Sequence, residues 1–440
     1  MGILKRCSGQ LFAGLLVLSA VTGCTVNPVT GESQFTIMSP AQEVSIGAKQ
    51  YGPSQQSQGG QYIVDPDLTV YVNSVGQKLA SVSERPDLPY EFVVLNNDVP
   101  NAWALPGGKI ALNRGLLVQL KDEAQLAAVL GHEVVHAAAR HSAQQMTQSM
   151  LLGVGSQLAT IAGNQTQYGQ LVGMGAQMGS ALYQARYGRG QELEADRYGM
   201  LYMARAGYEP EAAIELQETF VRLAEGKQSN WLEGMFASHP PSPQRVAENR
   251  IHASKLTSGV RNKSAFNRAM NQVRADQNAY AKNTEAVKAA NNKDFDLALS
   301  LVAKARALQP KEPLFLVTQG QLQLQQEHYK SALNSFHSAH KLYPEYYMPL
   351  LGSGIAAKQL KSYSRAIEDL TASNHILPNQ SATFYLGEIQ LAKGQKQEAI
   401  GYFRQAAQGG GDLGKRSQAY LQQLAPPATA PATQNSYRNQ

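Results

Sequence analysis

A pair of histidines with a glutamate beside the first constrains this chain most, within the apolar stretch LAAVLGHEVVHAAARH at residues 126–141. Each residue of a helix advances by about 100°, so His132 and His136 lie one turn apart on one face and can share a metal ion. Two neutral imidazoles at about 2.0–2.1 Å from zinc leave room for a third protein ligand and a water. Glu133 then lies beside the metal, where its carboxylate can take a proton from that water. The alternative is a chance pattern of hydrogen-bonded core histidines.

The third ligand is expected on another helix, over residues 191–206. Glu192 and Asp196 are i and i+4 and share a face of that helix, whereas Glu194 points away. A ligand carboxylate with a second carboxylate one turn on suits a metal site, because the second can orient a ligand imidazole or assist proton transfer. The alternative is a first helical turn enriched in acids, which the helix dipole favours anyway.

The N-terminus has the pattern of an export signal, with a basic start and an apolar run at residues 11–20 that is too short for a stable membrane span. Of the two cysteines, Cys7 would leave with a signal at residues 1–23. Cys24 follows Val-Thr-Gly, which is similar to a bacterial lipobox, so we expect lipid on it. Thr25 in place of Asp after the cysteine indicates the outer membrane. Ordinary signal cleavage with a spare thiol is the alternative.

Between this signal and the second helix, the sequence predicts a mixture of helices and strands. Residues 24–61 are polar and rich in Gly and Gln, so we expect a tether with one short helix. Residues 67–82 have helical periodicity, and residues 90–95, YEFVVL, predict a strand. A Pro-Gly-Gly turn at residues 106–108 predicts a hairpin at a sheet edge, which could receive an extended substrate. Residues 147–183 predict helices that line or cover the site rather than a membrane span.

A repeat begins near residue 290. Three sets of positions recur at 34-residue intervals, which is the tetratricopeptide period of helix pairs with small residues at their contacts and proline after the second helix. A weaker unit at residues 386–407 suits a terminal cap, and residues 408–440 are expected to be disordered. Such stacks form concave surfaces for protein partners. The repeated positions are Pro310, Pro344 and Pro378; Ala298, Ala332 and Ala366; and Phe295, Tyr329 and Tyr363.

Three further motifs accompany HExxH: NAWALPGG (residues 101–108), ExEAD (192–196) and Ser-His-Pro (238–240). With these motifs, about residues 30–255 of the chain resemble the gluzincin metallopeptidase family of the HtpX heat-shock proteases and CaaX prenyl endopeptidases. The resemblance implies a role for each matching residue. It implies that His132, His136 and Glu192 are ligands of one zinc ion, that Glu133 is the general base, and that Asp196 is the assisting acid or supports a ligand. His239 matches a histidine that in periplasmic members can approach the metal as an extra ligand and hold the enzyme off. A polar residue in a proline-rich turn is the alternative for His239.

An exported metallopeptidase domain followed by tetratricopeptide repeats also resembles the BepA-type periplasmic proteases, which act in outer-membrane protein assembly and quality control. We therefore predict an α+β fold with a mainly helical HExxH metallopeptidase domain that contains a small β-sheet. An all-α tetratricopeptide repeat domain follows it. The predicted boundaries are a metallopeptidase domain at residues 62–255, a connecting helix at 256–284, repeats at 285–410 and a disordered tail at 411–440.

The predicted function is that of a zinc-dependent endopeptidase of the periplasm, attached to the outer membrane through lipidated Cys24. Its expected substrates are misfolded or stalled envelope proteins, and it would aid outer-membrane protein assembly, with the barrel assembly machinery as a partner of the repeats. A formal net charge of +6 without a basic cluster gives little support for nucleic-acid binding. The alternative is a non-proteolytic chaperone or assembly scaffold that acts through the repeats and keeps a latent zinc site.

Overall fold

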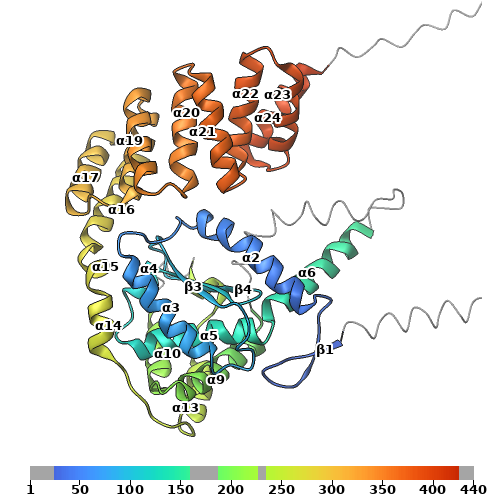
Figure 1. Cartoon of the computed structure of the whole chain (residues 1–440), viewed down its shortest axis with the longest axis vertical. Coiled ribbons are helices and arrows are strands. Elements are labelled where there is room, and N and C mark those ends of the chain that lie inside the picture. The colour runs from blue at the N-terminus through green and yellow to red at the C-terminus, as the bar shows by residue number, and fades with distance from the viewer. Residues whose placement is uncertain (1–23, 159–186, 226–233, 426–440) are drawn as a thin grey trace, which may run out of the picture. The chain divides into compact units, whose positions relative to one another are not determined.

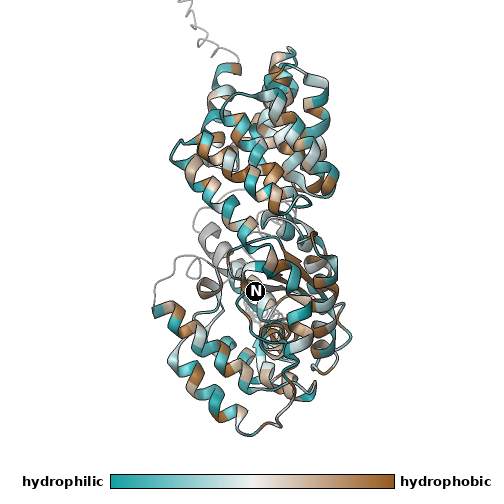
Figure 2. Ribbon diagram, turned by 90° about the vertical axis from the view of Figure 1, so that its left-hand side faces the viewer, coloured by the Kyte–Doolittle hydropathy of each residue, from teal (hydrophilic) through white to brown (hydrophobic). Residues whose placement is uncertain are grey.

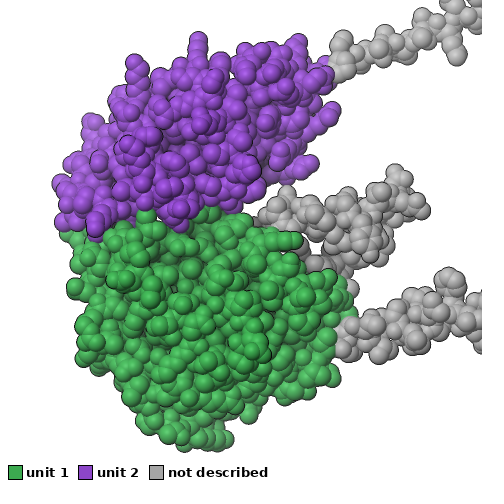
Figure 3. Space-filling model, in the orientation of Figure 1, with its two compact units in different colours: residues 1–281 green, residues 282–440 purple. Residues whose placement is uncertain are grey.

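The computed structural model of the chain describes residues 24–158, 187–225 and 234–425. The chain forms two compact units, Met1–Ala281 and Lys282–Gln440 (Figure 3). The expected signal at residues 1–23 and most of the apolar segment at residues 147–183 lie outside the described residues. Within the described ranges, we find no helix that is both long enough and apolar enough to cross a membrane.

The larger sheet of the first unit has three strands, β3 (Glu91–Leu95), β4 (Ala102–Leu105) and β5 (Lys109–Asn113) (Figure 1). Their order is β3-β5-β4, with β5 parallel to β3 and antiparallel to β4. The turn between β4 and β5 places Gly107 and Gly108 at φ values of 77° and 83°, which glycine adopts at little cost. The predicted hairpin is therefore confirmed, and β4 is an edge strand of this sheet.

Two helices that precede the sheet pack on it. α2 (Pro40–Ser57) begins with a capping box between Ser39 and Gln42, and its Tyr51 ring meets Trp103 of β4 edge-on, with centroids 6.1 Å apart. α3 (Pro66–Ala80) buries the apolar face that its periodicity predicts. It approaches β3 closely because Gly76 has no Cβ, which would otherwise lie 2.5 Å from the Phe92 ring.

Within residues 24–61, the predicted short helix is present as α2, but the predicted tether before it is wrong for the described residues from Cys24 onward. β1 (Cys24–Val26) and β2 (Ser33–Phe35) form an antiparallel hairpin. Asn27 in the turn of this hairpin is buried, as are Thr36 and Glu43 after it. Polar composition suggested a solvated segment, but these polar groups are buried because they hydrogen-bond to residues far along the chain, such as Glu194 and Thr147.

The helix that carries the two histidines is α5 (Glu123–Ala138), capped by the Asp122 side chain on the backbone N–H of Gln125. It is buried almost throughout, as predicted, but it ends before residue 141. Arg140 has a φ of 66°, so the chain breaks there and His141 begins a new helix, α6 (His141–Leu158). A left-handed residue between two helices ends the first and redirects the chain.

The remaining helices of the first unit follow the long apolar segment. The predicted single connecting helix at residues 256–284 is instead three helices, because Phe266, Met270 and Val273 are buried in the unit and do not form a spacer. The helices are α9 (Arg189–Arg205), α10 (Glu211–Glu225), α12 (Met235–Ser238), α13 (Pro243–Ala253), α14 (Lys263–Ala269) and α15 (Asn271–Ala275), and α16 (Gln277–Asn291) begins in this unit and continues into the second. A short helix, α4 (Arg114–Leu117), follows β5.

The second unit is made of helix pairs, as the 34-residue period predicts. Ala298, Ala332 and Ala366 are each fully buried, and the three prolines of the period follow α17, α19 and α21. Hydrophobic and hydrophilic residues are interspersed along these helices (Figure 2). The helices are α17 (Phe295–Leu308), α18 (Pro313–Gln325), α19 (Tyr329–Leu342), α20 (Tyr347–Gln359), α21 (Tyr363–Ile376), α22 (Gln380–Ala392) and α23 (Lys396–Ala407).

The predicted disordered tail is wrong over its first part, because residues Gly411–Leu424 form a helix, α24. The glycine- and glutamine-rich composition suggested disorder. Leu413, Tyr420 and Leu424 nevertheless pack on the last repeat, and the Tyr420 ring stacks on Phe403 at a centroid distance of 4.5 Å. The exposed end of a repeat stack needs such a covering helix.

Candidate metal centre

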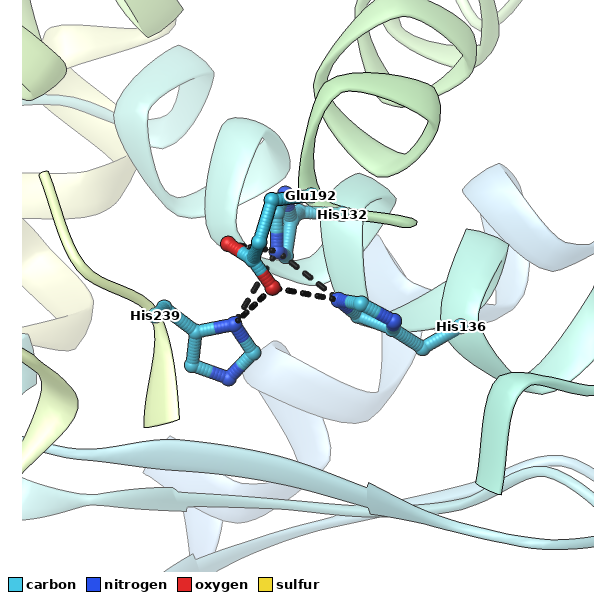
Figure 4. A group of neighbouring side chains, drawn as sticks. All are labelled: His132, His136, Glu192 and His239. Carbon is cyan, nitrogen blue, oxygen red and sulfur yellow. Dashed lines mark hydrogen bonds and ion pairs between the residues drawn. The ribbon is translucent and has the colours of Figure 1, made fainter. Parts of the chain in front are cut away.

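The imidazoles of His132 and His136 converge from one face of α5. Their Nε2 atoms lie 3.0 Å apart, and the two residues are 7% and 0% exposed. Figure 4 shows both rings directed toward the same point. The helical spacing therefore brings the two side chains together as the sequence predicts.

Glu192 enters the site from α9. Its Oε2 lies 3.6 Å from His132 Nε2, and its Oε1 lies 3.4 Å from His136 Nε2. α9 comes this close because it crosses α5 at two glycines, Gly199 and Gly131. A Cβ on Gly199 would lie 3.0 Å from the backbone nitrogen of His132. These glycines therefore set the separation between the helix that carries the histidines and the helix that carries the carboxylate.

His239 completes the group from the turn after α12. Its Nδ1 lies 3.3 Å from His132 Nε2 and 2.9 Å from Glu192 Oε1, and its Nε2 lies 3.6 Å from Glu133 Oε1. One ligand atom from each of His132, His136, Glu192 and His239 lies within 4.8 Å of the others, and all four residues are buried (Figure 4). Glu194 is not in this group and instead accepts a hydrogen bond from Asn27.

The residues fit a metal ion on two observations. Both carboxylate oxygens of the fully buried Glu133 lack a hydrogen-bond donor among the described residues, which is costly for a buried carboxylate without a cation nearby. The donor set is three imidazoles and one carboxylate, which suits zinc and several other divalent transition metals. A buried group that could bind a metal is therefore present at the position that the HExxH pattern predicts.

Asp196 supports the site from one turn further along α9. Its Oδ1 accepts a hydrogen bond from His132 Nδ1 at 3.0 Å. Arg245 of α13 donates to both oxygens of Asp196 at 2.7 Å, and Asn249 donates to Oδ2 at 3.2 Å. Arg245 also lies 2.8 Å from Glu192 Oε2 and donates to the Pro240 carbonyl at 3.0 Å. One guanidinium therefore holds both acidic residues and the turn that carries His239.

The charges of the site are set by burial and by these pairs. Burial alone would lower the pKa of His132, but Glu192 and Asp196 raise that pKa to about 10. Burial lowers the pKa of His136 well below its ordinary value and raises the pKa of Glu133. Despite burial, Arg245 lowers the pKa of Asp196. A metal at this position would take the place of the proton on His132, so its binding releases that proton.

Sequence reasoning missed four residues that contact the site. Arg245 and Asn249 are i and i+4 on α13, a spacing that signals a shared face but not what the face meets. Tyr187 stacks on His136, with centroids 3.7 Å apart, and its hydroxyl lies 3.0 Å from Ser142 Oγ. His141 Nδ1 lies 2.8 Å from His136 Nδ1. The sequence shows His141 five residues after His136, but it does not predict the helix break at Arg140 that brings the two rings together.

An apolar cavity of about 40 Å³ lies beside the group. His132 and His239 form one part of its wall, and Val129, Met203, Leu216 and Phe220 form much of the rest. A cavity needs roughly 10–15 Å³ to hold one water-sized group, so this one holds about three non-hydrogen atoms. The cavity is therefore of a size for a small aliphatic side chain.

Comparison with known proteins gives a family match over residues 66–251, to peptidase family M48. A beta-barrel assembly-enhancing protease of Yersinia pestis is 30% identical over 261 residues, which are 57% of this chain and 51% of that protein. The protein of the same name from Escherichia coli is 27% identical over 72% of this chain and 70% of that protein. The mitochondrial metalloendopeptidase OMA1 of Schizosaccharomyces pombe is 37% identical over 40% of this chain and 51% of that protein. The match thus spans about half of the Yersinia relative.

Solved structures similar to the chain include tetratricopeptide proteins. A thermophilic tetratricopeptide protein of Thermus thermophilus covers 33% of this chain at 19% identity, with a TM-score of 0.30 and 80% of its own length covered. The repeat assignment rests on the 34-residue period and the helix pairs of the chain itself. The family match to residues 66–251 is independent of the repeats, and it contains His132, Glu133, His136 and Glu192. Residues 66–251, which carry the candidate metal centre, are therefore similar to peptidase family M48.

Proposed function

We propose that the chain is a zinc-dependent endopeptidase of the bacterial envelope, with His132, His136 and Glu192 as ligands of one zinc ion. The observation that supports this most is the convergence of these three side chains on a buried point beside Glu133, whose carboxylate has no hydrogen-bond donor among the described residues. A zinc ion held there would polarise the scissile carbonyl and make a water molecule more acidic.

In this proposal Glu133 is the general base. Its carboxylate takes the proton of the attacking water and returns it to the leaving amine, and burial raises its pKa toward the range in which it can do both. Asp196 acts through His132 rather than on the substrate. Both of its oxygens are already hydrogen-bonded, to His132, Arg245 and Asn249, so it fixes the imidazole with Nε2 toward the metal.

The proposed substrates are unfolded or misassembled envelope proteins in extended conformation. The names of the Yersinia and Escherichia coli relatives associate those proteins with assembly of beta-barrels. β4 is an edge strand of its sheet, although its residues are buried and its Ala104 carbonyl accepts hydrogen bonds from Ser142 and Tyr187. The cavity beside His132 has room for a small aliphatic side chain. The tetratricopeptide repeats provide a surface for protein partners, among them the barrel assembly machinery. These relatives do not favour a scaffold without proteolysis.

The proposed location is the periplasm, with attachment to the outer membrane by lipid on Cys24. The support is the Val-Thr-Gly-Cys sequence after an apolar run, together with the names of the relatives. Mass spectrometry of the mature N-terminus tests the anchor. An unmodified Cys24, or a mature chain that starts elsewhere, would reject it.

His239 is proposed to restrain the site. Its imidazole nitrogen lies 3.3 Å from His132 Nε2 and 2.9 Å from Glu192 Oε1, in the space that a water or a substrate carbonyl would need. The variant His239→Ala should therefore cleave faster while its zinc content stays at one per chain, because three ligands remain. An inactive variant with zinc in place would show instead that His239 binds substrate or stabilises the transition state.

Purified mature protein, incubated with casein and with an unfolded outer-membrane barrel protein, tests the enzyme proposal. Cleavage should stop when a chelator removes the metal and should return when zinc is added back. Cleavage that survives complete metal removal, or that no divalent metal restores, would contradict it. A folded barrel protein is the control, because an extended substrate is required at a sheet edge.

A further inference from the structure

We infer that His141 is a positioning residue for His136, and that the N-terminal hairpin supports the metal centre through Asn27 and Glu194. The inference rests on the proposed function, since it takes His136 as a metal ligand. It adds three residues that neither the motif nor the family match assigns to the site. It also gives the segment after Cys24 a role in the chemistry instead of a role as a tether.

The two histidines of α5 are supported in different ways. His132 and His136 both direct Nε2 to the centre, so with a metal bound there the proton of each ring lies on Nδ1. His132 Nδ1 donates to Asp196, whereas His136 Nδ1 donates to His141 Nδ1 at 2.8 Å. His136 is 0% exposed and His141 is 1% exposed. Without His141, the N–H of His136 would be buried with no acceptor there, which destabilises this tautomer and ring orientation.

The contacts continue from His141 to the N-terminal hairpin. When His141 Nδ1 accepts, its proton lies on Nε2, which faces Glu194 Oε1 at 3.4 Å in a polar contact that does not have the geometry of a hydrogen bond. The same oxygen of Glu194 accepts a hydrogen bond from Asn27 Nδ2 at 2.7 Å. Asn27 Oδ1 in turn accepts the backbone N–H of Val29 at 2.9 Å, so both ends of this amide are used and its orientation is fixed. The order from the centre outward is His136, His141, Glu194, Asn27.

The same N-terminal segment also fixes where His141 lies. Arg140, whose φ of 66° separates α5 from α6, donates to the Met38 carbonyl and pairs with Glu43 of α2. Further along α6, Thr147 Oγ1 lies 3.1 Å from Thr36 Oγ1, just after β2. Residues 36–43 therefore hold the chain on both sides of His141. The helix break that turns His141 toward His136 depends on contacts from the N-terminal segment.

Outer hydrogen-bond partners of a ligand histidine typically contribute about 10–100-fold to metal affinity. The expected effect is therefore on how tightly zinc is held, and it can be measured without any substrate. The metal-free protein is titrated with Zn²⁺ in competition with a chelator of known affinity. Thermal unfolding of the metal-free form is recorded in parallel to show that each variant is folded.

Two variants at His141 separate hydrogen bonding from shape. His141→Phe keeps a ring and removes the acceptor, and zinc affinity should fall by about 10–100-fold. His141→Asn restores an acceptor near the position of Nδ1, and it should recover most of that loss. In Co²⁺-loaded protein, the visible absorption spectrum should shift in His141→Phe and remain like the wild type in His141→Asn. An affinity for zinc in His141→Phe equal to that of the wild type would overturn the role of His141.

A matched pair of hairpin variants tests the outer part. Asn27→Ala removes the hydrogen bond to Glu194 and should lower zinc affinity by a smaller factor, about threefold to tenfold. Thr147→Val is the control, because it removes the hairpin contact at Thr36 and leaves the contacts from His136 to Asn27 in place. Equal losses in the two variants would mean that docking of the hairpin matters and the Asn27 contact does not, which would overturn this part of the inference. If the wild type itself binds no zinc, the proposed function fails, and that result is distinct from these.

Discussion

The repeats of the second unit reuse one set of contacts at a fixed interval, whereas the metal centre of the first unit depends on contacts that each occur once. Ala298, Ala332 and Ala366 are buried in the same way in successive helix pairs. At the metal centre, by contrast, Glu192 reaches His132 across 60 residues of sequence by way of a single helix crossing at Gly199. A change in one repeat should therefore be felt mainly by its neighbours, while a change at the centre should alter the site as a whole.

The largest effect is expected for Glu133→Gln. The amide fills the same buried space but cannot accept the proton of the attacking water, so cleavage should fall about a thousandfold or more while zinc content and unfolding temperature stay unchanged. Single-turnover cleavage of an unfolded substrate, with metal analysis of the same sample, measures both. Activity within tenfold of the wild type would rule out Glu133 as the base.

Replacement of a metal ligand comes next. His132→Ala, His136→Ala and Glu192→Ala should each lower bound zinc below one per chain, because three protein ligands define the proposed site. The surface acid Glu211, replaced by Ala, is the matched control and should keep full occupancy. Full zinc occupancy in Glu192→Ala would show that another acid is the third ligand.

The sequence predicts the repeats of the second unit more fully than the metal centre of the first, because the repeats reuse one set of contacts and the metal centre does not. The 34-residue period placed Ala298, Ala332 and Ala366 in the core because each repeat samples the same environment. The helical spacing of His132 and His136 was likewise local information. The contacts of Asn27 and Arg245 were not predictable, because they join residues far apart in sequence and no period marks them. The sequence predicted a tether in place of the N-terminal hairpin, because its polar residues give it the composition of a solvent-exposed segment although several of them are buried.

A core variant in the second unit sharpens the comparison. The Phe336 ring fills the space left by two glycines, because a Cβ on Gly320 or Gly352 would lie 2.7 Å or 2.3 Å from it. Phe336→Ala should destabilise this unit by about 3–5 kcal/mol and leave the zinc affinity of the first unit unchanged. The exposed neighbour His337, replaced by Ala, should change stability by less than about 0.5 kcal/mol. Loss of zinc binding in Phe336→Ala would mean that the two regions are coupled.

The smallest effect is expected at the helix crossing, where Gly199→Ala adds one methyl group. That methyl would lie 3.0 Å from the backbone nitrogen of His132 and 3.2 Å from the Gly131 carbonyl carbon, and neither backbone atom can rotate away. Overpacking of this kind costs about 1–3 kcal/mol, and alanine returns about 1 kcal/mol through its better helix propensity. We therefore expect the free energy of unfolding of the metal-free protein to fall by about 1 kcal/mol. Zinc binding should also weaken, because α9 carries Glu192 away from the histidines.

Gly190→Ala on the same helix is the control, since nothing lies within 4 Å of the added atom, and it should be neutral or stabilising. Zinc binding unchanged in Gly199→Ala would show that the crossing distance does not control the site, and that the Arg245 contacts alone hold Glu192 in place.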